Sequence, residues 1–93
     1  MVTAIILLNV ERGKVNGVAE RLLGVPGVYE VYSVAGRYDL AVVVRVEQNE
    51  QLADLVTEHM MGLEGILSTE TLIAFRAFSR RDLEAGFSLG AQP

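Results

Sequence analysis

Apolar side chains in the first three quarters of the chain follow two periods, one typical of strands and one typical of helices. Within Val2–Val10 both odd and even positions are apolar, which predicts a strand covered on both faces. After Gly13 the apolar residues recur three and four positions apart, as on one side of a helix that ends at Gly24. This stripe consists of Val15, Val18, Ala19, Leu22 and Leu23.

The middle of the chain predicts a hairpin. Pro26 and Gly27 interrupt the helical pattern, and a run rich in β-branched and aromatic residues follows. A second apolar run extends over Leu40–Val46. The connection between the two runs, Ala35–Asp39, is so short that the strands must be antiparallel neighbours.

The second half of the chain repeats the order of the first. Asn49 is expected to cap a second helix, which closes between Gly62 and Gly65, and Ile66–Phe78 predicts a last strand. The apolar stripe of this helix consists of Leu52, Leu55, Val56, Met60 and Leu63. The order β-α-β-β-α-β predicts an α+β, ferredoxin-like fold, with a four-stranded antiparallel sheet and both helices on one face.

The other face of the predicted sheet is apolar too. The chain has 93 residues, of which 51% are hydrophobic, and a domain of this size cannot bury so much apolar surface in its own core. We therefore expect this face to pack on a second copy in a two-fold dimer. Residues 1–78 would form the domain, and residues 79–93 a tail with a short helix start at Ser79–Asp82. Phe87 and Leu89 of this tail are expected either to contact a neighbouring subunit or to fray.

Composition and charge argue against several classes of function. The chain has no cysteine, and its formal net charge of −4, with scattered basic residues, argues against direct nucleic-acid binding. The apolar N-terminal run is too short to span a membrane and lacks a basic start, so we expect a cytoplasmic protein. His59 is the single histidine and cannot bind a metal unaided. We expect no catalytic residues, no metal and no cofactor, because no catalytic triad or phosphate-binding loop can be assembled.

Two short segments could bind a ligand. The turn containing Gly36, Tyr38 and Asp39 offers an approachable backbone, an aromatic wall and a carboxylate, which together could hold an ammonium group. Alternatively, Gly36 supplies a positive φ and Asp39 bonds nearby backbone amides. Thr69 and Thr71 share one face of the last strand, where they could bind a carboxylate or serve as ordinary β-branched residues. The residue chemistry alone leaves both alternatives open.

Three segments of the chain resemble the effector-binding (RAM) domain of the Lrp/AsnC, or feast/famine, transcriptional regulators. They are Leu23–Val28, Ala35–Leu40 and Ser68–Ile73, within a likeness that covers residues 1–78. The resemblance implies a dimeric α/β barrel that binds small effectors, usually amino acids, in pockets between dimers arranged as a ring, such as an octamer. The ligand contacts that it implies are Gly36, Arg37, Tyr38, Asp39, Thr69 and Thr71. Asp39 would take the α-ammonium group by a charge-assisted bond.

Full regulators of this family carry an N-terminal helix-turn-helix domain, whereas this chain begins at the first strand of the effector domain. The resemblance therefore implies a stand-alone version that regulates indirectly, either through co-assembly with a full-length relative or by sequestering effector. Two alternatives share the same architecture, and fold alone does not separate them. One is a cofactor-free enzyme of the dimeric α/β barrel type, with His59 as its proton-transfer group. The other is an ACT-like regulatory module, with Gly13 at the ligand turn.

Overall fold

The strands and helices follow one another in the predicted order. The computed structural model describes residues 1–78 and residue 80, and in this part the second helix continues into a π-helix, η1. The elements are β1 (Val2–Val10), α1 (Val15–Leu23), β2 (Val28–Ser33), β3 (Leu40–Val46), α2 (Asn49–Asp54), η1 (Leu55–Met60) and β4 (Ile66–Ile73). Apart from Arg80, the predicted tail features at Ser79–Asp82, Phe87 and Leu89 lie outside the described residues.

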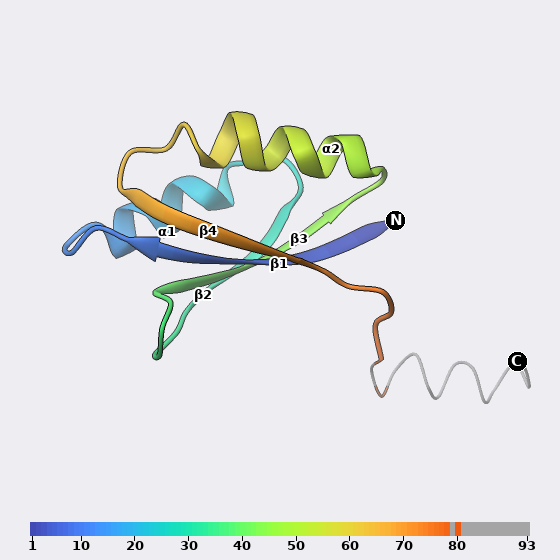
Figure 1. Cartoon of the computed structure of the whole chain (residues 1–93), viewed down its shortest axis with the longest axis horizontal. Helices are drawn as coiled ribbons and strands as arrows, with labels where there is room; N and C mark the ends of the chain where they lie inside the picture. The colour runs from blue at the N-terminus through green and yellow to red at the C-terminus, as the bar shows by residue number, and fades with distance from the viewer. Residues whose placement is uncertain (79, 81–93) are drawn as a thin grey trace, which may run out of the picture.

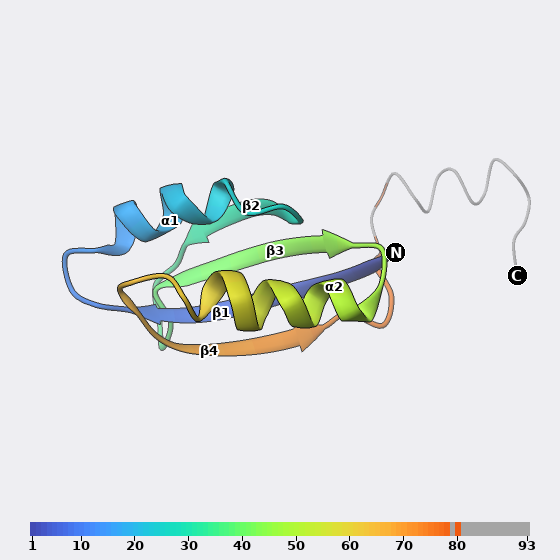
Figure 2. The same cartoon turned by 90° about the horizontal axis from the view of Figure 1, so that it is seen from above.

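The described strands form an antiparallel sheet in the order β2-β3-β1-β4. Both helices lie on the same face of this sheet, with α1 beside β2 and α2 on the side of β1 and β4 (Figures 1 and 2). The opposite face carries no helix of the described part of the chain (Figure 1). The predicted α+β, ferredoxin-like fold is confirmed.

Alternate residues of the central strands face the helices and form the core. Ile6 of β1 lies opposite Val42 of β3, and both side chains are fully buried. The buried residues are Ala4, Ile6, Leu8, Val10, Val18, Leu22, Leu40, Val42, Val44, Leu52, Leu55 and Met60. Burying an aliphatic side chain of this size contributes about 1.5–3 kcal/mol, so the layer between helices and sheet supplies most of the stability.

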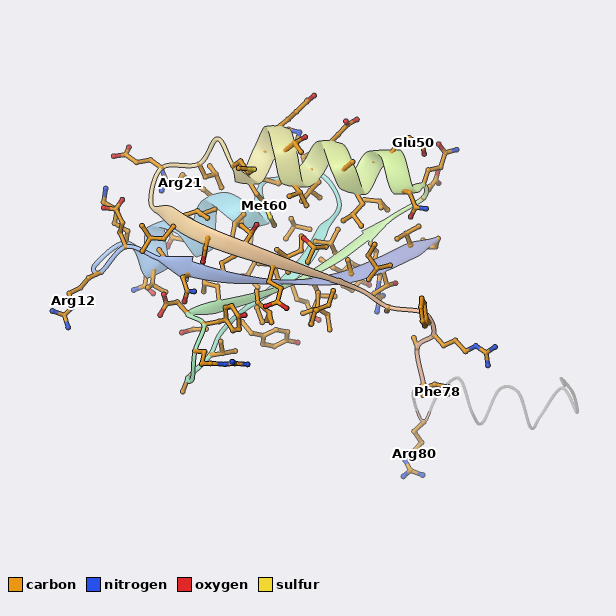
Figure 3. All side chains as sticks on the ribbon, viewed as in Figure 1. Arg12, Arg21, Glu50, Met60, Phe78 and Arg80 are labelled. Carbon is orange, nitrogen blue, oxygen red and sulfur yellow. The ribbon has the colours of Figure 1, made fainter. Side chains whose placement is uncertain are left out.

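The second helix changes from α- to π-helical at Leu55. In an α-helix His59 would follow Leu55 by four residues and would point toward the sheet. The wider η1 turn, with a bond from the Met61 N–H to the Val56 carbonyl (3.1 Å), delays the inward position by one residue. Met60 is therefore buried between helix and sheet (Figure 3), and His59 is exposed. The predicted single α-helical stripe is therefore corrected, because the helix widens within it.

The prediction that Asn49 caps the second helix is wrong. Gln48 is the N-cap residue, and Asn49 is the first residue inside the helix. The Gln51 side-chain oxygen Oε1 accepts hydrogen bonds from the backbone N–H groups of Glu47 (2.8 Å) and Gln48 (2.9 Å). A glutamine three residues after the N-cap can satisfy the N–H groups of Glu47 and Gln48, because its side chain is long enough to reach back over the first turn.

Strand β4 ends at Ile73, so its predicted extension to Phe78 is wrong. Ile73 lies opposite Ala4 of β1, and the Ala74 N–H still donates to the Thr3 carbonyl (2.9 Å). Because β1 begins at Val2, only two residues before Ala4, a β4 that reached Phe78 would run past its neighbouring strand. Phe78 is 87% exposed and lies well beyond the sheet (Figure 3).

Candidate functional site

Asp39 ties the turn between β2 and β3 to the end of β1. Its backbone N–H donates to the Leu8 carbonyl (2.8 Å), and its carboxylate oxygen Oδ2 accepts from the Val10 N–H (2.8 Å). Its carbonyl accepts from the Val34 N–H (3.0 Å), which closes the turn. The Asp39 carboxylate thus accepts a hydrogen bond from a backbone amide, which is the second of the two alternatives in the sequence analysis. The amide belongs to Val10 of β1 and not to the turn itself. The turn is held at a fixed position relative to the sheet.

Gly36 lies at the open tip of this turn. Its φ of +132° is a backbone conformation that side-chain-bearing residues rarely adopt, so the predicted positive φ is confirmed. No heavy atom lies within 4 Å of the position that a β-carbon would take at Gly36. The neighbouring Arg37 is exposed. A ligand can therefore approach the backbone of the turn from outside.

Tyr38 connects the turn to strand β4. Its hydroxyl donates a hydrogen bond to the Glu70 carboxylate, which raises the pKa of Tyr38 above its ordinary value of 10.0. Desolvation and the negative charge of Glu70 add to this rise in pKa, and the charge of Arg37 opposes it. In Figure 1 the turn curves toward the side of the sheet away from the helices. Tyr38 therefore meets β4 on the side away from the helices.

Thr69 and Thr71 face the opposite way. They lie opposite Leu8 and Ile6 of β1, two buried residues of the helix-side core, so the two threonines share one face as predicted. Glu70 lies between them and points to the other face, because side chains alternate along a strand. Within one chain the structure therefore brings Tyr38 to β4 but leaves the threonines on the other side of that strand.

A polar group beside the turn was missed in the sequence analysis. The Asn9 side-chain amide donates to the Ser68 hydroxyl (3.1 Å), next to the contact between Tyr38 and Glu70. These four side chains occupy one end of a sheet face that is otherwise largely apolar, with Ile5 at 40% exposed. Asn9 and Glu70 were detectable as polar positions in apolar strands, but the pairing of β1 with β4 that joins them was not.

A cleft of about 350 Å³ opens at the other end of the hairpin. It lies between the start of β2, the end of β3 and the second helix, and it contains none of the predicted ligand-contacting residues. Its lining consists of Pro26, Gly27, Arg45, Val46, Glu47, Gln51, Asp54, Leu55 and His59. The sequence analysis named His59 but did not place these residues together.

Membrane-spanning helices and metal-binding clusters are both missing from the described residues. In residues 1–78 and 80, no helix combines the length and the apolar character needed to cross a membrane. Over the same residues, no three histidine, aspartate or glutamate side chains are grouped so that they could hold a metal ion.

Gly13, which the ACT-like alternative placed at a ligand turn, has a φ of +84° in the connection between β1 and α1. Nothing lies within 4 Å of the position that a β-carbon would take there.

Residues 3–83 match the family model described as the Lrp/AsnC ligand binding domain. The chain belongs to the Lrp/AsnC family. This membership decides against the ACT-like alternative. In this Lrp/AsnC chain the turn with Asp39 lies in the hairpin and the threonine pair lies on β4, as described above.

Relatives and solved structures agree with this assignment. This Lrp/AsnC chain is 36% identical over 76 residues to the HTH-type transcriptional regulator FL11 of Pyrococcus furiosus, covering 81% of this chain and 49% of FL11. The chain thus spans about half the length of this relative. It superposes on TTHA0845 of Thermus thermophilus with a TM-score of 0.81 and 45% identity, covering 86% of this chain and 100% of that protein.

A more distant solved structure shares the fold. It is the transcriptional regulator NMB0573 of Neisseria meningitidis, which was solved as a complex with L-Met. The TM-score is 0.76 at 11% identity, and the match covers 85% of this chain and 53% of that protein. At this identity the likeness concerns the fold alone.

Proposed function

We propose that this chain is an amino-acid-sensing module that binds a free amino acid between copies of itself and does not act as an enzyme. Its binding residues are Gly36, Arg37, Tyr38, Asp39, Thr69 and Thr71. The observation that supports this proposal best is the division of these residues within one chain. Tyr38 reaches β4 from one face, and the threonines lie on the other. A ligand that contacts both groups must take the turn from one copy and the threonines from another.

The chemistry of the turn suits an α-amino acid. The Val10 N–H occupies only oxygen Oδ2 of Asp39, so oxygen Oδ1 can accept a charge-assisted bond from an α-ammonium group. The open backbone at Gly36 and the hydroxyls of Thr69 and Thr71 can bind the α-carboxylate. The complex of the Neisseria meningitidis regulator with L-Met supports this class of ligand.

Assembly would proceed in two steps. The apolar sheet face packs on a second copy to form a dimer, and the dimers form a ring, such as an octamer, with the ligand sites between them. In this proposal residues 1–78 form the binding domain and residues 79–93 contact a neighbouring subunit. A ligand that binds only the ring stabilises it by about 2.7 kcal/mol at a hundredfold excess over its dissociation constant.

The regulatory output of the module would be indirect. Relatives such as FL11 are transcriptional regulators of about twice the matched length. We assign to this chain a cytoplasmic role in which amino-acid binding is passed to a full-length relative by co-assembly. Direct binding to an operator is not part of the proposal, because the net charge of −4 provides no basic surface for phosphate contacts.

The proposal is tested by titrating each of the twenty amino acids while following the sedimentation coefficient and the melting temperature. At least one amino acid should raise both. Asp39→Asn retains an oxygen for the Val10 N–H but removes the charge, so it should weaken binding at least tenfold while the chain stays folded. Glu20→Gln, on the exposed side of α1, is the control and should bind as the wild type does. The absence of a response to every amino acid would contradict the proposal.

A further inference from the structure

The cleft at the far end of the hairpin is separate from the proposed amino-acid site. The amino-acid site lies at the turn before Leu40, whereas the cleft is lined by Val46 and Glu47 at the other end of β3. Six residues of extended strand place these two ends about 20 Å apart. A volume of about 350 Å³ is within the range of small-molecule sites.

The floor of the cleft is apolar and closely packed. Pro26, Val46 and Leu55 line it, and Gly27 lies where the strands meet the helix. A β-carbon on Gly27 would come within 2.9 Å of Val46 Cγ1 and 3.1 Å of Leu55 Cδ1. The Gly27 carbonyl accepts from the Arg45 N–H (2.9 Å), which fixes the start of β2 against the end of β3. The shape of the cleft is therefore built into the fold.

The polar wall of the cleft depends on the π-helix. Gln51 and Asp54 line the cleft from α2, and His59 lines it from η1. Asp54 and His59 are five residues apart, a spacing that would turn them away from each other on an α-helix. The i→i+5 turn brings residues of this spacing onto one side of the helix. The same widening that buries Met60 thus presents the Asp54 carboxylate and the His59 imidazole to one cleft.

The charge of the lining is negative. Glu47 and Asp54 contribute two carboxylates, and within the described part of the chain neither forms an ion pair with a basic side chain. The guanidinium of Arg45 lies over the Tyr29 ring, 4.4 Å from the ring centroid. Arg45 pairs with Thr3 of β1, which places its side chain on the sheet face away from the helices. Acceptor groups above an apolar floor favour a cation with a short hydrocarbon chain.

We infer that this cleft binds a small aliphatic amine, with Glu47 and Asp54 accepting from its ammonium groups and Val46 and Leu55 contacting its chain. A diamine offers one ammonium group to each carboxylate, and 1,5-diaminopentane serves as the probe. Gln51 and His59 line the same wall of the cleft as Asp54. Such binding gives the chain a second ligand, independent of the proposed amino-acid site.

The test uses 1,5-diaminopentane and the full chain, followed by amide chemical shifts at constant ionic strength. Saturable changes should centre on Gly27, Glu47 and His59, with a dissociation constant on the order of 1 mM for so small and open a site. Asp54→Asn and Glu47→Gln should each weaken binding roughly tenfold, the effect of losing one charge-assisted bond. Glu50→Gln, an acidic residue of the same helix outside the lining, is the matched control and should not weaken it.

A gain of affinity can be tested at Gln51. Gln51→Glu keeps an oxygen for the Glu47 and Gln48 N–H groups and adds a carboxylate to the wall, so binding should tighten several-fold. The uncharged 1,5-pentanediol, which has the same length, should not bind.

Two results would overturn the inference. One is the absence of saturable change at ten times the expected dissociation constant. The other is an equal loss of binding in Glu50→Gln, which would indicate a diffuse attraction to acidic surface. The amino-acid titration of Asp54→Asn should match the wild type, so this inference and the proposed function can fail separately.

Discussion

A β-carbon added at Gly27 would clash with its neighbours, whereas a β-carbon added at Gly17 would meet no other atom. At Gly27 the φ of +97° and the contacts of 2.9 Å with Val46 and 3.1 Å with Leu55 both oppose a side chain. Gly27→Ala should therefore lower the free energy of unfolding by about 2–4 kcal/mol, combining backbone strain and overpacking. At Gly17, inside α1, nothing lies within 4 Å of the β-carbon position. Gly17→Ala should raise the free energy of unfolding by about 0.5–1 kcal/mol.

Urea unfolding of both variants at one protein concentration measures these two effects. Equal concentration matters because self-association would contribute to the apparent stability. Equal or same-sign changes at Gly27 and Gly17 would contradict the packing described for the start of β2.

At the level of elements, the Tyr38–Glu70 hydrogen bond attaches the β2–β3 turn to β4 and makes the attachment sensitive to pH. The pKa of Tyr38 is raised in the folded chain, so the bond stabilises the fold below the ordinary value of 10.0. This contribution is lost as the pH rises through the folded-state pKa, because the phenolate and the Glu70 carboxylate then repel each other. The wild type should exceed Tyr38→Phe in stability near neutral pH, and this difference should begin to shrink above about pH 10 and be lost once the pH has passed the folded-state pKa of Tyr38.

Glu70→Gln offers a direct check on the cause. Removing the carboxylate should lower the pKa of Tyr38, as followed by NMR of the ring carbons. Glu30→Gln is the control, because Glu30 raises the pKa of Tyr32 in the same way but does not touch Tyr38. An unchanged Tyr38 titration in Glu70→Gln would contradict the hydrogen bond.

Most elements were predictable from periodicity, and the exceptions have local physical causes. The strands at Val2–Val10 and Leu40–Val46 are confirmed, and so is the stripe of α1 except at Leu23, which is 57% exposed. The π-helix was not predicted. Its signal is the pair His59–Met60, in which the apolar residue comes one position too late for an α-helix. The end of β4 depends on where β1 begins, and this is a pairing that no local pattern contains.

For the whole molecule, the sequence could name candidate site residues but could not arrange them. The threonine pair was predictable from strand alternation, and its common face is confirmed. The sequence does not show whether the threonines and Tyr38 lie on the same face of the sheet. That depends on the register of β4 against β1 and on the β2–β3 turn, which curves away from the helices (Figure 1). The cleft escaped prediction for a similar reason, because its lining comes from three segments separated along the chain.

The apolar face of the sheet leads to the last prediction, which concerns assembly. Ile5 lies at its centre, between Val43 of β3 and Leu72 of β4, and is 40% exposed in the single chain. If a second copy covers this face, Ile5→Lys places a charge twice in a two-fold interface, where it has no partner. The dissociation constant of the dimer should rise at least a hundredfold, on the order of the cost of burying unpaired charges.

The fold itself should survive Ile5→Lys, because the buried core lies on the other face of β1. Sedimentation velocity should then show a folded monomer where the wild type forms a dimer or a larger ring. Glu58→Gln, on the exposed side of η1, changes the net charge by the same amount and should sediment as the wild type does. A wild-type chain that stays monomeric at about 100 μM would refute self-association through this face. It would also remove the between-copy amino-acid site, since the turn and the threonines could then never meet.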